Sequence, residues 1–278
     1  MKDFSNWIEQ GRQFTKCAMG EEGFVSDQDQ KKPQPPLYKA PMRQDVIRLP
    51  HDFSCLGPAG DFAALVNSRQ SRRVYSGEGM SLMELSFLLW ASQGVKSIRG
   101  RNYATLRTVP SGGARHAFEA YFVANRVEGL APGAYHYLPQ SHGVEYLGPV
   151  EGGESALTAM LSGQRWGAKG DAVFFFSLVP YRAEWRYGIY AHRIALVDLG
   201  HVGQALYMGA EALGLGTCGI GAFDQALCDK AFGLDGQEEY TVYAQPVGRC
   251  RREDAPRELS FYAWLDADNP VEPKSEDE

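Results

Sequence analysis

The chain has 278 residues, of which 44% are hydrophobic and 22% charged, and this balance excludes a disordered or low-complexity protein. The formal net charge of −6 argues against broad binding to nucleic acid or to an anionic membrane, because both require a positive surface. The five cysteines are widely spaced without a Cys-x-x-Cys pair, so neither a disulfide framework nor a thiolate zinc site is expected. The N-terminus lacks the unbroken apolar core of a signal peptide. We therefore expect a cytoplasmic protein whose partner is a small molecule or another protein.

Composition divides the chain into three parts. Residues 1–50 are polar and end in a stretch with five prolines, which favour extended backbone, so we expect an extended N-terminal arm. Residues 266–278 form an acidic tail. Residues 51–265 contain neither a fixed repeat nor a Ser/Gly linker, which predicts a single domain.

The first regular element after the arm is a predicted helix over residues 81–93. Ser81 and Glu84 form a capping-box pattern, and the leucines that follow share one helical face. Gly94 is a suitable residue to end the helix.

Four later segments have the composition of strands, namely residues 119–125, 134–138, 172–179 and 240–247. The first two are close enough in sequence to form a hairpin or two neighbouring strands. The third, AVFFFSLV, is apolar throughout, which indicates burial on both faces. It is the longest apolar run and is far too short to span a membrane.

Two helices are expected in the second half of the chain. Residues 191–213 have a helical pattern with eight small residues, so this helix is predicted to be central or to pack closely on a partner helix. Residues 223–234 predict a shorter helix with Asp224 as its N-cap. Strands separated by helices, with a helix before the first strand, indicate an α+β or mixed α/β fold.

The basic segment SRQSRRVY, residues 68–75, places Arg69, Arg72 and Arg73 within five positions of an acidic chain. Guanidinium groups at this density suit a phosphate or another anionic ligand, because their planar donors match its oxygen atoms. The alternative is a solvated basic surface.

The segment PSGGARH, residues 110–116, contains two adjacent glycines that would let the backbone approach a planar ligand closely. A tight turn is the alternative. A hydrolase site with Ser111 as nucleophile, His116 or His201 as base and Asp198 as orienting residue is disfavoured, because the sharp strand-to-helix elbow sequence is missing.

Two further segments carry unusual chemistry. GLGTCGIG, residues 214–221, contains a formal G-x-G-x-x-G, but a helical pattern precedes it where a dinucleotide site needs a strand. We expect a helix stop and an extended segment there. AEWRYG, residues 183–188, contains a carboxylate, a guanidinium, an indole and a phenol, and we expect it to form a loop before the long helix. Such a loop would carry either a functional site or an interface anchored by aromatic side chains.

The remaining histidines and basic residues are less informative. His136 and His192 lack metal-ligand spacing, so we expect structural roles and no metal site. The basic run over residues 248–252 follows a strand and could contact a phosphate or lie exposed.

Taken together and in this order, five segments resemble the nitroreductase-like flavoprotein family, and within it the SagB-type dehydrogenases. They are RQSRRVY, SLMELSFLLWASQGV, PSGGARHAFEAYFVANRVEGLAPGAYHYLP, RYGIYAHRIALVDLGHVGQALYMGAEALGLGTCGIGAF and QPVGR, and they cover about residues 65–250. The resemblance implies an α+β fold with a mixed, mainly antiparallel central sheet flanked by helices, a domain completed by homodimerisation, and FMN held between the subunits.

The resemblance also implies roles for individual residues. Residues that match the segment around the phosphate, ribityl chain and pyrimidine edge of FMN are Arg69, Gln70, Ser71 and Arg73. Residues that match the loop placed beside the flavin ring by the other subunit are Pro110, Ser111, Gly112 and Gly113. Ile220, Gly221 and Ala222 match the stretch whose backbone approaches flavin N5. Arg249 or Arg251 would complete the phosphate site.

The activity implied by the resemblance is hydride transfer between a substrate and flavin N5, with dioxygen or another acceptor reoxidising the flavin. The substrate of SagB-type enzymes is commonly a peptide thiazoline or oxazoline, and a Lys-Tyr pair is associated with proton removal. Arg186 and Tyr187 match that pair, so arginine replaces the lysine. Because arginine keeps its proton, Arg186 is not expected to act as a general base and could instead orient an anionic substrate. Tyr187 could still take part in proton transfer.

Two other functions are compatible with the same sequence. One is an NAD(P)H-dependent reductase of nitroaromatics or quinones. The other is a non-catalytic flavin-dimer scaffold that binds a biosynthetic partner or precursor peptide, with the proline-rich arm as a docking segment.

Overall fold

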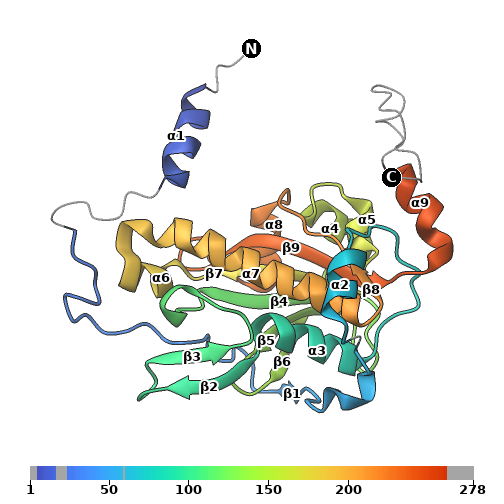
Figure 1. Ribbon diagram of the computed structural model, residues 1–278, viewed down its shortest axis with the longest axis horizontal. Helices are drawn as coiled ribbons and strands as arrows, with labels where there is room; N and C mark the ends of the chain where they lie inside the picture. The colour runs from blue at the N-terminus through green and yellow to red at the C-terminus, as the bar shows by residue number, and fades with distance from the viewer. Residues whose placement is uncertain (1–4, 17–23, 59, 262–278) are drawn as a thin grey trace.

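The structure is a computed structural model that describes residues 5–16, 24–58 and 60–261, and a seven-stranded sheet lies at its centre (Figure 1). In spatial order the strands are β1 (Val46–Arg48), β6 (Gly143–Gly148), β5 (Gly133–Leu138), β4 (Phe118–Ala124), β7 (Ala172–Leu178), β9 (Tyr240–Arg249) and β8 (Leu215–Thr217). Neighbouring strands are antiparallel throughout this sheet. A separate antiparallel hairpin is formed by β2 (Val95–Arg99) and β3 (Ala104–Arg107).

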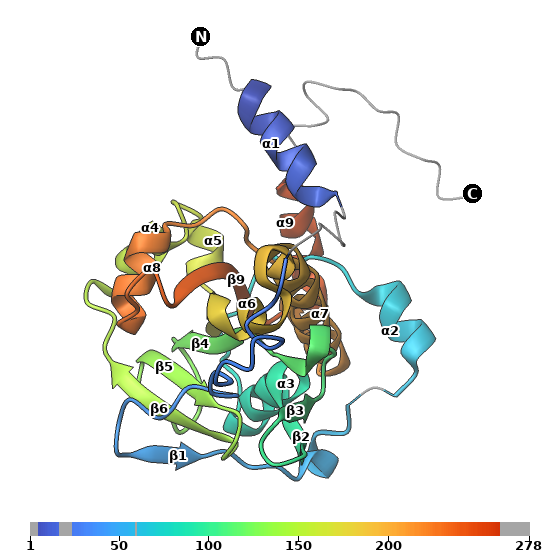
Figure 2. The ribbon, with the colours of Figure 1, turned by 90° about the vertical axis from the view of Figure 1, so that its left-hand side faces the viewer.

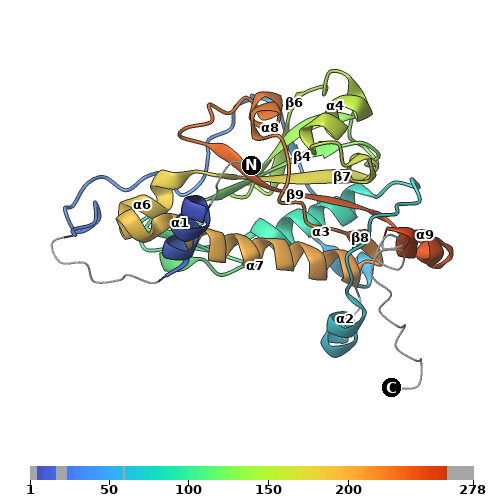
Figure 3. The same cartoon turned by 90° about the horizontal axis from the view of Figure 1, so that it is seen from above.

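Helices cover both faces of the sheet (Figure 3). They are α1 (Ser5–Thr15), α2 (Phe62–Ser68), α3 (Leu82–Gln93), α4 (Gly153–Met160), α5 (Arg165–Ala168), α6 (Pro180–Tyr187), α7 (Ala191–Ala212), α8 (Gln225–Phe232) and α9 (Ala255–Ser260). Short 3-10 helices are η1 (Phe53–Leu56), η2 (Gly112–Ala114), η3 (Gly188–Tyr190) and η4 (Arg252–Asp254). Helices α3 and α7 lie on one face, and α4 and α8 lie on the other (Figure 3). This arrangement confirms the predicted α+β fold.

The predicted helix ends are confirmed. The Ser81 hydroxyl accepts a hydrogen bond from the Glu84 backbone at 3.1 Å, and the Glu84 carboxylate accepts one from the Ser81 backbone at 2.8 Å. These reciprocal bonds satisfy donors that the first turn of α3 leaves unpaired. At α8 the Asp224 carboxylate caps the Leu227 backbone at 3.0 Å.

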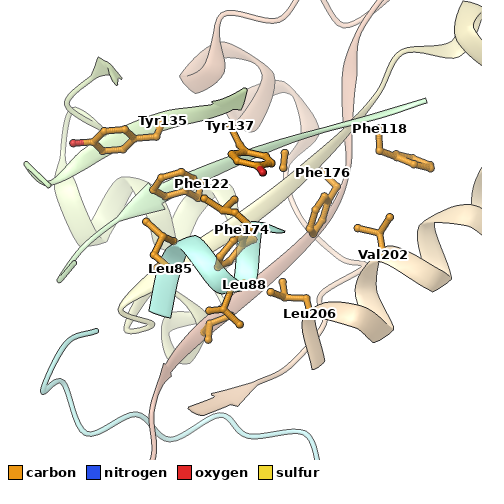
Figure 4. Close-up of a cluster of buried hydrophobic side chains, with 14 of the residues drawn as sticks. Leu85, Leu88, Phe118, Phe122, Tyr135, Tyr137, Phe174, Phe176, Val202 and Leu206 are labelled. Atoms are coloured by element: carbon orange, nitrogen blue, oxygen red, sulfur yellow. The ribbon is translucent and has the colours of Figure 1, made fainter. Parts of the chain in front are cut away.

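The strands at the centre of the sheet are buried on both faces, as the apolar run in β7 predicts. Phe174 and Phe176 point toward α3 and α7, where they meet Phe122 of β4 (Figure 4). Val173 and Phe175 point to the opposite face and pack in the cluster under α4 and α8. Because successive side chains of a strand alternate between faces, only a sheet covered on both sides accommodates such a run. The predicted hairpin of β4 and β5 is also confirmed.

The long helix α7 spans Ala191–Ala212 and lies across the sheet beside α3. Val202 and Leu206 point into the core, whereas Leu196 and Val197 are 51% and 55% exposed. Gly200 is exposed as well, and a methyl group placed on it would meet no heavy atom within 4 Å. One side of this helix therefore presents apolar and small residues outward.

Three expectations need correction. Residues 183–188 were expected in a loop, but all except Gly188 lie in α6, where Pro180 occupies the first turn and supplies a φ suited to helix. The arm is not extended throughout, because Ser5–Thr15 form α1; Val46–Arg48 are extended, as expected, and join the sheet as β1. The mixed character of the sheet is limited: in the described residues, parallel pairing occurs only in isolated bridges such as Ser71 with Thr217.

None of the helices in the described part of the chain is long and apolar enough to cross a membrane.

Candidate active site

The predicted site residues gather mainly in two clusters along α7. The C-terminal cluster, at the C-terminal half of that helix, consists of Arg69, Ser71, Tyr207 and Gly219. The Tyr207 hydroxyl accepts a hydrogen bond from the Gly219 backbone at 2.7 Å and lies 3.2 Å from the Ser71 hydroxyl. The Arg69 guanidinium lies over the Tyr207 ring, 5.4 Å from its centre. Tyr207 thus joins the basic segment to the glycine-rich segment.

A pocket of about 650 Å³ lies beside Arg73, next to the basic segment. Its walls include Gln164, Trp166, Lys169 and Arg257. The Arg73 guanidinium lies 5.7 Å from the centre of the Trp166 ring. Several cations and an aromatic ring line one cavity, which is a combination that suits an anionic, ring-containing ligand.

Gln164 connects this pocket to the segment Ile220 to Ala222. Its side-chain amide donates a hydrogen bond to the Ala222 carbonyl at 2.7 Å. Ile220 is held in the sheet by paired backbone bonds with Ala244. Gly221 is exposed, and a methyl group placed on it would meet no atom within 4 Å. The backbone at Gly221, which carries no side chain, therefore faces open space beside the pocket next to Arg73.

The N-terminal cluster surrounds the first turns of α7 and consists of Ser111, Gly112, Gly113 and Asp198. The Asp198 carboxylate accepts hydrogen bonds from the Ser111 hydroxyl at 2.7 Å and from the Gly112 backbone at 3.0 Å. Asp198 is buried, and burial raises the pKa of its carboxyl above the ordinary value, although those hydrogen bonds oppose the shift. Gly113 adopts a left-handed φ of 55°, which favours glycine.

Arg186 and Tyr187 of α6 lie directly against this cluster. A methyl group placed on Gly113 would stand 2.5 Å from the Arg186 side chain and 2.9 Å from the Tyr187 hydroxyl. Burial alone would lower the pKa of Arg186, but hydrogen bonds to the hydroxyls of Tyr187 and Tyr103 raise it above the ordinary value. Arg186 is therefore a permanent cation, as its residue type predicts.

The geometry does not support a hydrolase triad in this loop. Asp198 contacts Ser111 directly, with no imidazole between them. The imidazole Nε2 of His116 is 3.1 Å from the Thr105 carbonyl, and only the His116 backbone contacts the Ser111 hydroxyl. Burial and the nearby Arg107 lower the pKa of His116 to about 3, so its ring is neutral near pH 7. A serine nucleophile needs an imidazole at its hydroxyl, whereas the Ser111 hydroxyl donates to Asp198 and accepts from the His116 backbone. Among the described residues it makes no hydrogen bond to the His201 ring.

The remaining predicted residues are not part of either cluster. The Arg249 guanidinium pairs with Glu84 at 2.7 Å, at the start of α3. Arg251 pairs with Glu78 on the surface. Gln70 and Pro110 are exposed next to their respective clusters. The two C-terminal arginines are thus engaged by carboxylates in this structure.

Two residues in these sites were not predicted. Tyr207 is the only Phe, Trp or Tyr in α7, and that isolation among small residues was its one available signal. Gln164 lies in a turn before α5 without any motif around it. Its role depends on a contact with Ala222, 58 positions along the chain, and no local pattern encodes such a contact.

The histidines expected to be structural are held by carboxylates. His136 is buried on β5, where Nδ1 lies 2.7 Å from Glu145 and Nε2 lies 3.5 Å from Glu119. His192 of α7 lies 2.7 Å from Glu184 near the surface. Within the described residues there is no group of three or more His, Cys, Asp or Glu side chains that could hold a metal ion.

Comparison with known proteins identifies a family and a relative that this chain resembles. The model of the nitroreductase family matches residues 66–249. A protein of Methanocaldococcus jannaschii, provisionally named a nitroreductase, is 35% identical over 182 residues, which cover 65% of this chain and 87% of the relative. The region matched by the family model contains both clusters and Arg186 and Tyr187.

Solved structures agree on the fold. A crystal structure from Anabaena variabilis, also provisionally named a nitroreductase, has a TM-score of 0.59 at 24% identity and covers 77% of this chain, which in turn spans 45% of that one. A chain of the Escherichia coli microcin synthetase McbBCD complex with truncated pro-MccB17 bound has a TM-score of 0.55 at 17% identity, covering 90% and 95% of the two chains. The family match and the shared fold lead to one conclusion: this chain belongs to the nitroreductase family, whose members are typically FMN-dependent oxidoreductases.

Proposed function

We propose that the protein is an FMN-dependent oxidoreductase of the SagB-type branch that acts as a homodimer on a modified peptide or a related small substrate. The observation that carries the proposal is that two side chains join the basic segment and its pocket to the segment around Gly221, whose backbone is uncovered: Tyr207 contacts Ser71 and Gly219, and Gln164 of the pocket beside Arg73 bonds Ala222. These groups lie within the region matched by the family model.

The residues present fit FMN in their chemistry. Arg69 and Ser71 supply donors for a phosphate, and Arg73 supplies a guanidinium for the electron-rich edge of the ring. The bare backbone at Gly221 allows a flat ring to approach without meeting a side chain. When bound, FMN supplies the two-electron chemistry, accepting or returning a hydride at N5. The cations of this chain stabilise the negative charge that accompanies reduction.

A second copy of the chain would bring the two clusters together. Asp198 and Tyr207 are nine positions apart on α7, which corresponds to roughly 14 Å along the helix axis. The exposed, small residue Gly200 lies between them. If two α7 helices crossed antiparallel near Gly200, Tyr207 of one subunit would lie opposite the first turn of α7 in the other, where Ile194 adjoins Gly112 of the N-terminal cluster. The exposed Leu196 and Val197 provide the apolar surface for such a contact.

The SagB-type assignment is supported by the pair Arg186 and Tyr187 and by the likeness in fold to a chain of the McbBCD complex, a structure that contains a peptide. Arg186 would orient a carboxylate or carbonyl oxygen of the substrate, because it cannot accept a proton. Tyr187, whose hydroxyl lies beside Gly113, is the residue placed to exchange a proton with the substrate.

A second candidate is an NAD(P)H-dependent reductase of nitroaromatics or quinones. Its support is the Methanocaldococcus relative, which is 35% identical and provisionally named a nitroreductase. A structure from Staphylococcus epidermidis, provisionally named an NAD(P)H:FMN oxidoreductase, shares the fold with a TM-score of 0.50 at 14% identity. A non-catalytic flavin scaffold is a third candidate. It would require that arginine at position 186, in place of the lysine of SagB-type enzymes, has abolished azoline oxidation.

Visible absorption of the purified protein tests the cofactor, and anaerobic addition of NADH and NADPH separates the candidates. Oxidised-flavin bands that persist with both nicotinamides and bleach with an azoline peptide would support the dehydrogenase. Fast bleaching by a nicotinamide would instead support the reductase. A colourless protein that does not bind added FMN would refute both.

The variant Arg186→Lys tests the scaffold candidate. If the wild type does not oxidise an azoline peptide and Arg186→Lys does, the arginine is the cause of the loss. Tight peptide binding with no oxidation by either form would support the scaffold.

A further inference from the structure

A segment of the N-terminal arm, residues 24–39 and here called the strap, lies along α6 (Figure 2). The Gln28 backbone donates a hydrogen bond to the Trp185 carbonyl at 2.8 Å, and the Trp185 indole donates one to the Lys32 carbonyl at 3.0 Å. A methyl group placed on Gly188 would stand 1.8 Å from the Phe24 ring. The strap is thus in close contact with the helix that carries Arg186 and Tyr187.

The C-terminal end of the strap is hydrogen-bonded to a buried, charged carboxylate. The Lys39 backbone donates to the Glu119 carboxylate at 2.8 Å. Glu119 also pairs with the buried guanidinium of Arg182 at 2.5 Å. Although burial alone would raise the pKa of Glu119, Arg182 and His136 hold it below the ordinary value. The carboxylate is therefore ionised and is a strong acceptor, which fixes the path of the strap.

One strap side chain reaches the candidate catalytic pair. The Gln28 amide oxygen accepts a hydrogen bond from Arg186 Nη1 at 2.9 Å, and its amide nitrogen donates one to the Tyr103 hydroxyl at 3.2 Å. Arg186 Nη1 also donates to the Tyr103 hydroxyl at 2.9 Å. The three side chains close a triangle of hydrogen bonds around Arg186 Nη1.

We propose that Gln28 is a positioning residue for Arg186 and that the strap forms the outer wall of the substrate site. An arginine side chain has considerable rotamer freedom, and the planar amide of Gln28 restricts it by accepting from one nitrogen while bonding the neighbouring tyrosine. The inference rests on the proposed function in one respect, that Arg186 and Tyr187 face the substrate.

The test measures the chemical accessibility of Arg186 in the full-length protein. Phenylglyoxal modifies guanidinium groups, and peptide mass spectrometry gives the rate at each arginine. Gln28→Ala should raise the rate at Arg186 about tenfold, because loss of a hydrogen bond to a charged group corresponds to roughly 1.4 kcal/mol or more. The rate at the exposed Arg48 and the melting temperature should not change.

Two further variants make the result specific. Gln30 lies two positions away on the strap, and its side chain bonds only the Val25 carbonyl among the described residues, so Gln30→Ala is the matched control and should match the wild type. Gln28→Glu keeps an acceptor for Arg186 and should restore protection.

The results separate this inference from the proposed function. Equal rates at Arg186 in Gln28→Ala and wild type would refute the positioning role. So would a general rise at all arginines accompanied by a lower melting temperature, because that pattern indicates a structural role alone. Flavin content is measured on the same samples: flavin-free protein with the expected rates contradicts only the cofactor proposal, whereas flavin-bound protein with unchanged rates contradicts only the role of Gln28.

Discussion

The N-terminal cluster on α7 has its polar groups paired within the chain, whereas the region of the C-terminal cluster, taken with the adjoining pocket beside Arg73 and the backbone at Gly221, presents cations and uncovered backbone to open space. At the first, Asp198 accepts from Ser111 and Gly112, and glycine at 113 makes room for Arg186. At the second, Arg69 rests on the Tyr207 ring and Gly221 has no neighbour within 4 Å of a placed methyl group.

This difference assigns separate physical roles to the two clusters. A region whose donors and acceptors are mutually satisfied contributes to folding, and it keeps its geometry without a ligand. A region with cations and uncovered backbone gains its partners on binding. Substitutions in the N-terminal cluster should therefore alter stability, and those in the C-terminal cluster should alter ligand affinity.

The largest effect is expected from a charge placed on the exposed side of α7, next to the N-terminal cluster. Val197→Asp would bury a carboxylate in the proposed subunit contact, at a cost of several kcal/mol, so the dimer should weaken about a thousandfold or more. Multi-angle light scattering gives the mass in solution, and flavin content should fall with it. Leu227→Asp is the control, because Leu227 is 40% exposed on α8, on the opposite face of the sheet. A Val197→Asp dimer that retains flavin would refute the proposed contact.

Arg69→Ala tests the binding role of the C-terminal cluster. Loss of one charge-assisted hydrogen bond to a phosphate should raise the FMN dissociation constant about 10- to 100-fold. The stability of the flavin-free protein should stay close to that of the wild type, because Arg69 is only half-buried. Fluorescence titration with FMN and urea unfolding of the apoprotein measure the two quantities. A stability loss without any change in affinity would reverse the assigned roles.

His116 makes the stability of the N-terminal cluster depend on pH. Its pKa is lowered from 6.5 to about 3, so the native state favours the neutral ring. The stabilising contribution is complete above pH 6.5 and is lost as pH falls through that value toward 3, by up to about 1.4 kcal/mol per pH unit. Urea unfolding at pH 7, 6 and 5 should therefore show a steeper loss for the wild type than for His116→Gln. Equal slopes would contradict the buried, neutral state of this ring.

A pair of glycine substitutions compares the N-terminal cluster with the segment beside the C-terminal cluster. Gly113→Ala forces a left-handed φ on alanine, which costs about 1–2 kcal/mol, and its methyl group would press on Arg186. Gly221→Ala should leave the apoprotein unchanged within about 0.5 kcal/mol and weaken FMN binding several-fold, if the ring lies on that backbone. Thermal unfolding of both apoproteins and FMN titration give the comparison. A destabilised Gly221→Ala apoprotein would show that the space there is not open.

Much of the fold could be predicted from local pattern. The capping box at Ser81, the N-cap at Asp224 and the apolar run in β7 each depend on residues a few positions apart. The helix α6 was missed because AEWRYG is short and carries no apolar periodicity, and its helical state depends on packing against α7 and the strap.

The candidate site, like the fold, could be predicted only in part from local sequence. The segments with phosphate-binding and glycine-rich chemistry could be identified from residue type, because residue type sets charge, donors and backbone freedom. Three features depend on how the chain packs: Arg249 pairs with Glu84, Tyr207 and Gln164 link distant segments, and Gln28 reaches Arg186. Those contacts join residues 12 to 165 positions apart. Their formation depends on how α7, the sheet and the strap pack, since a side chain's nearest neighbours in space are set by that packing and not by its neighbours in sequence.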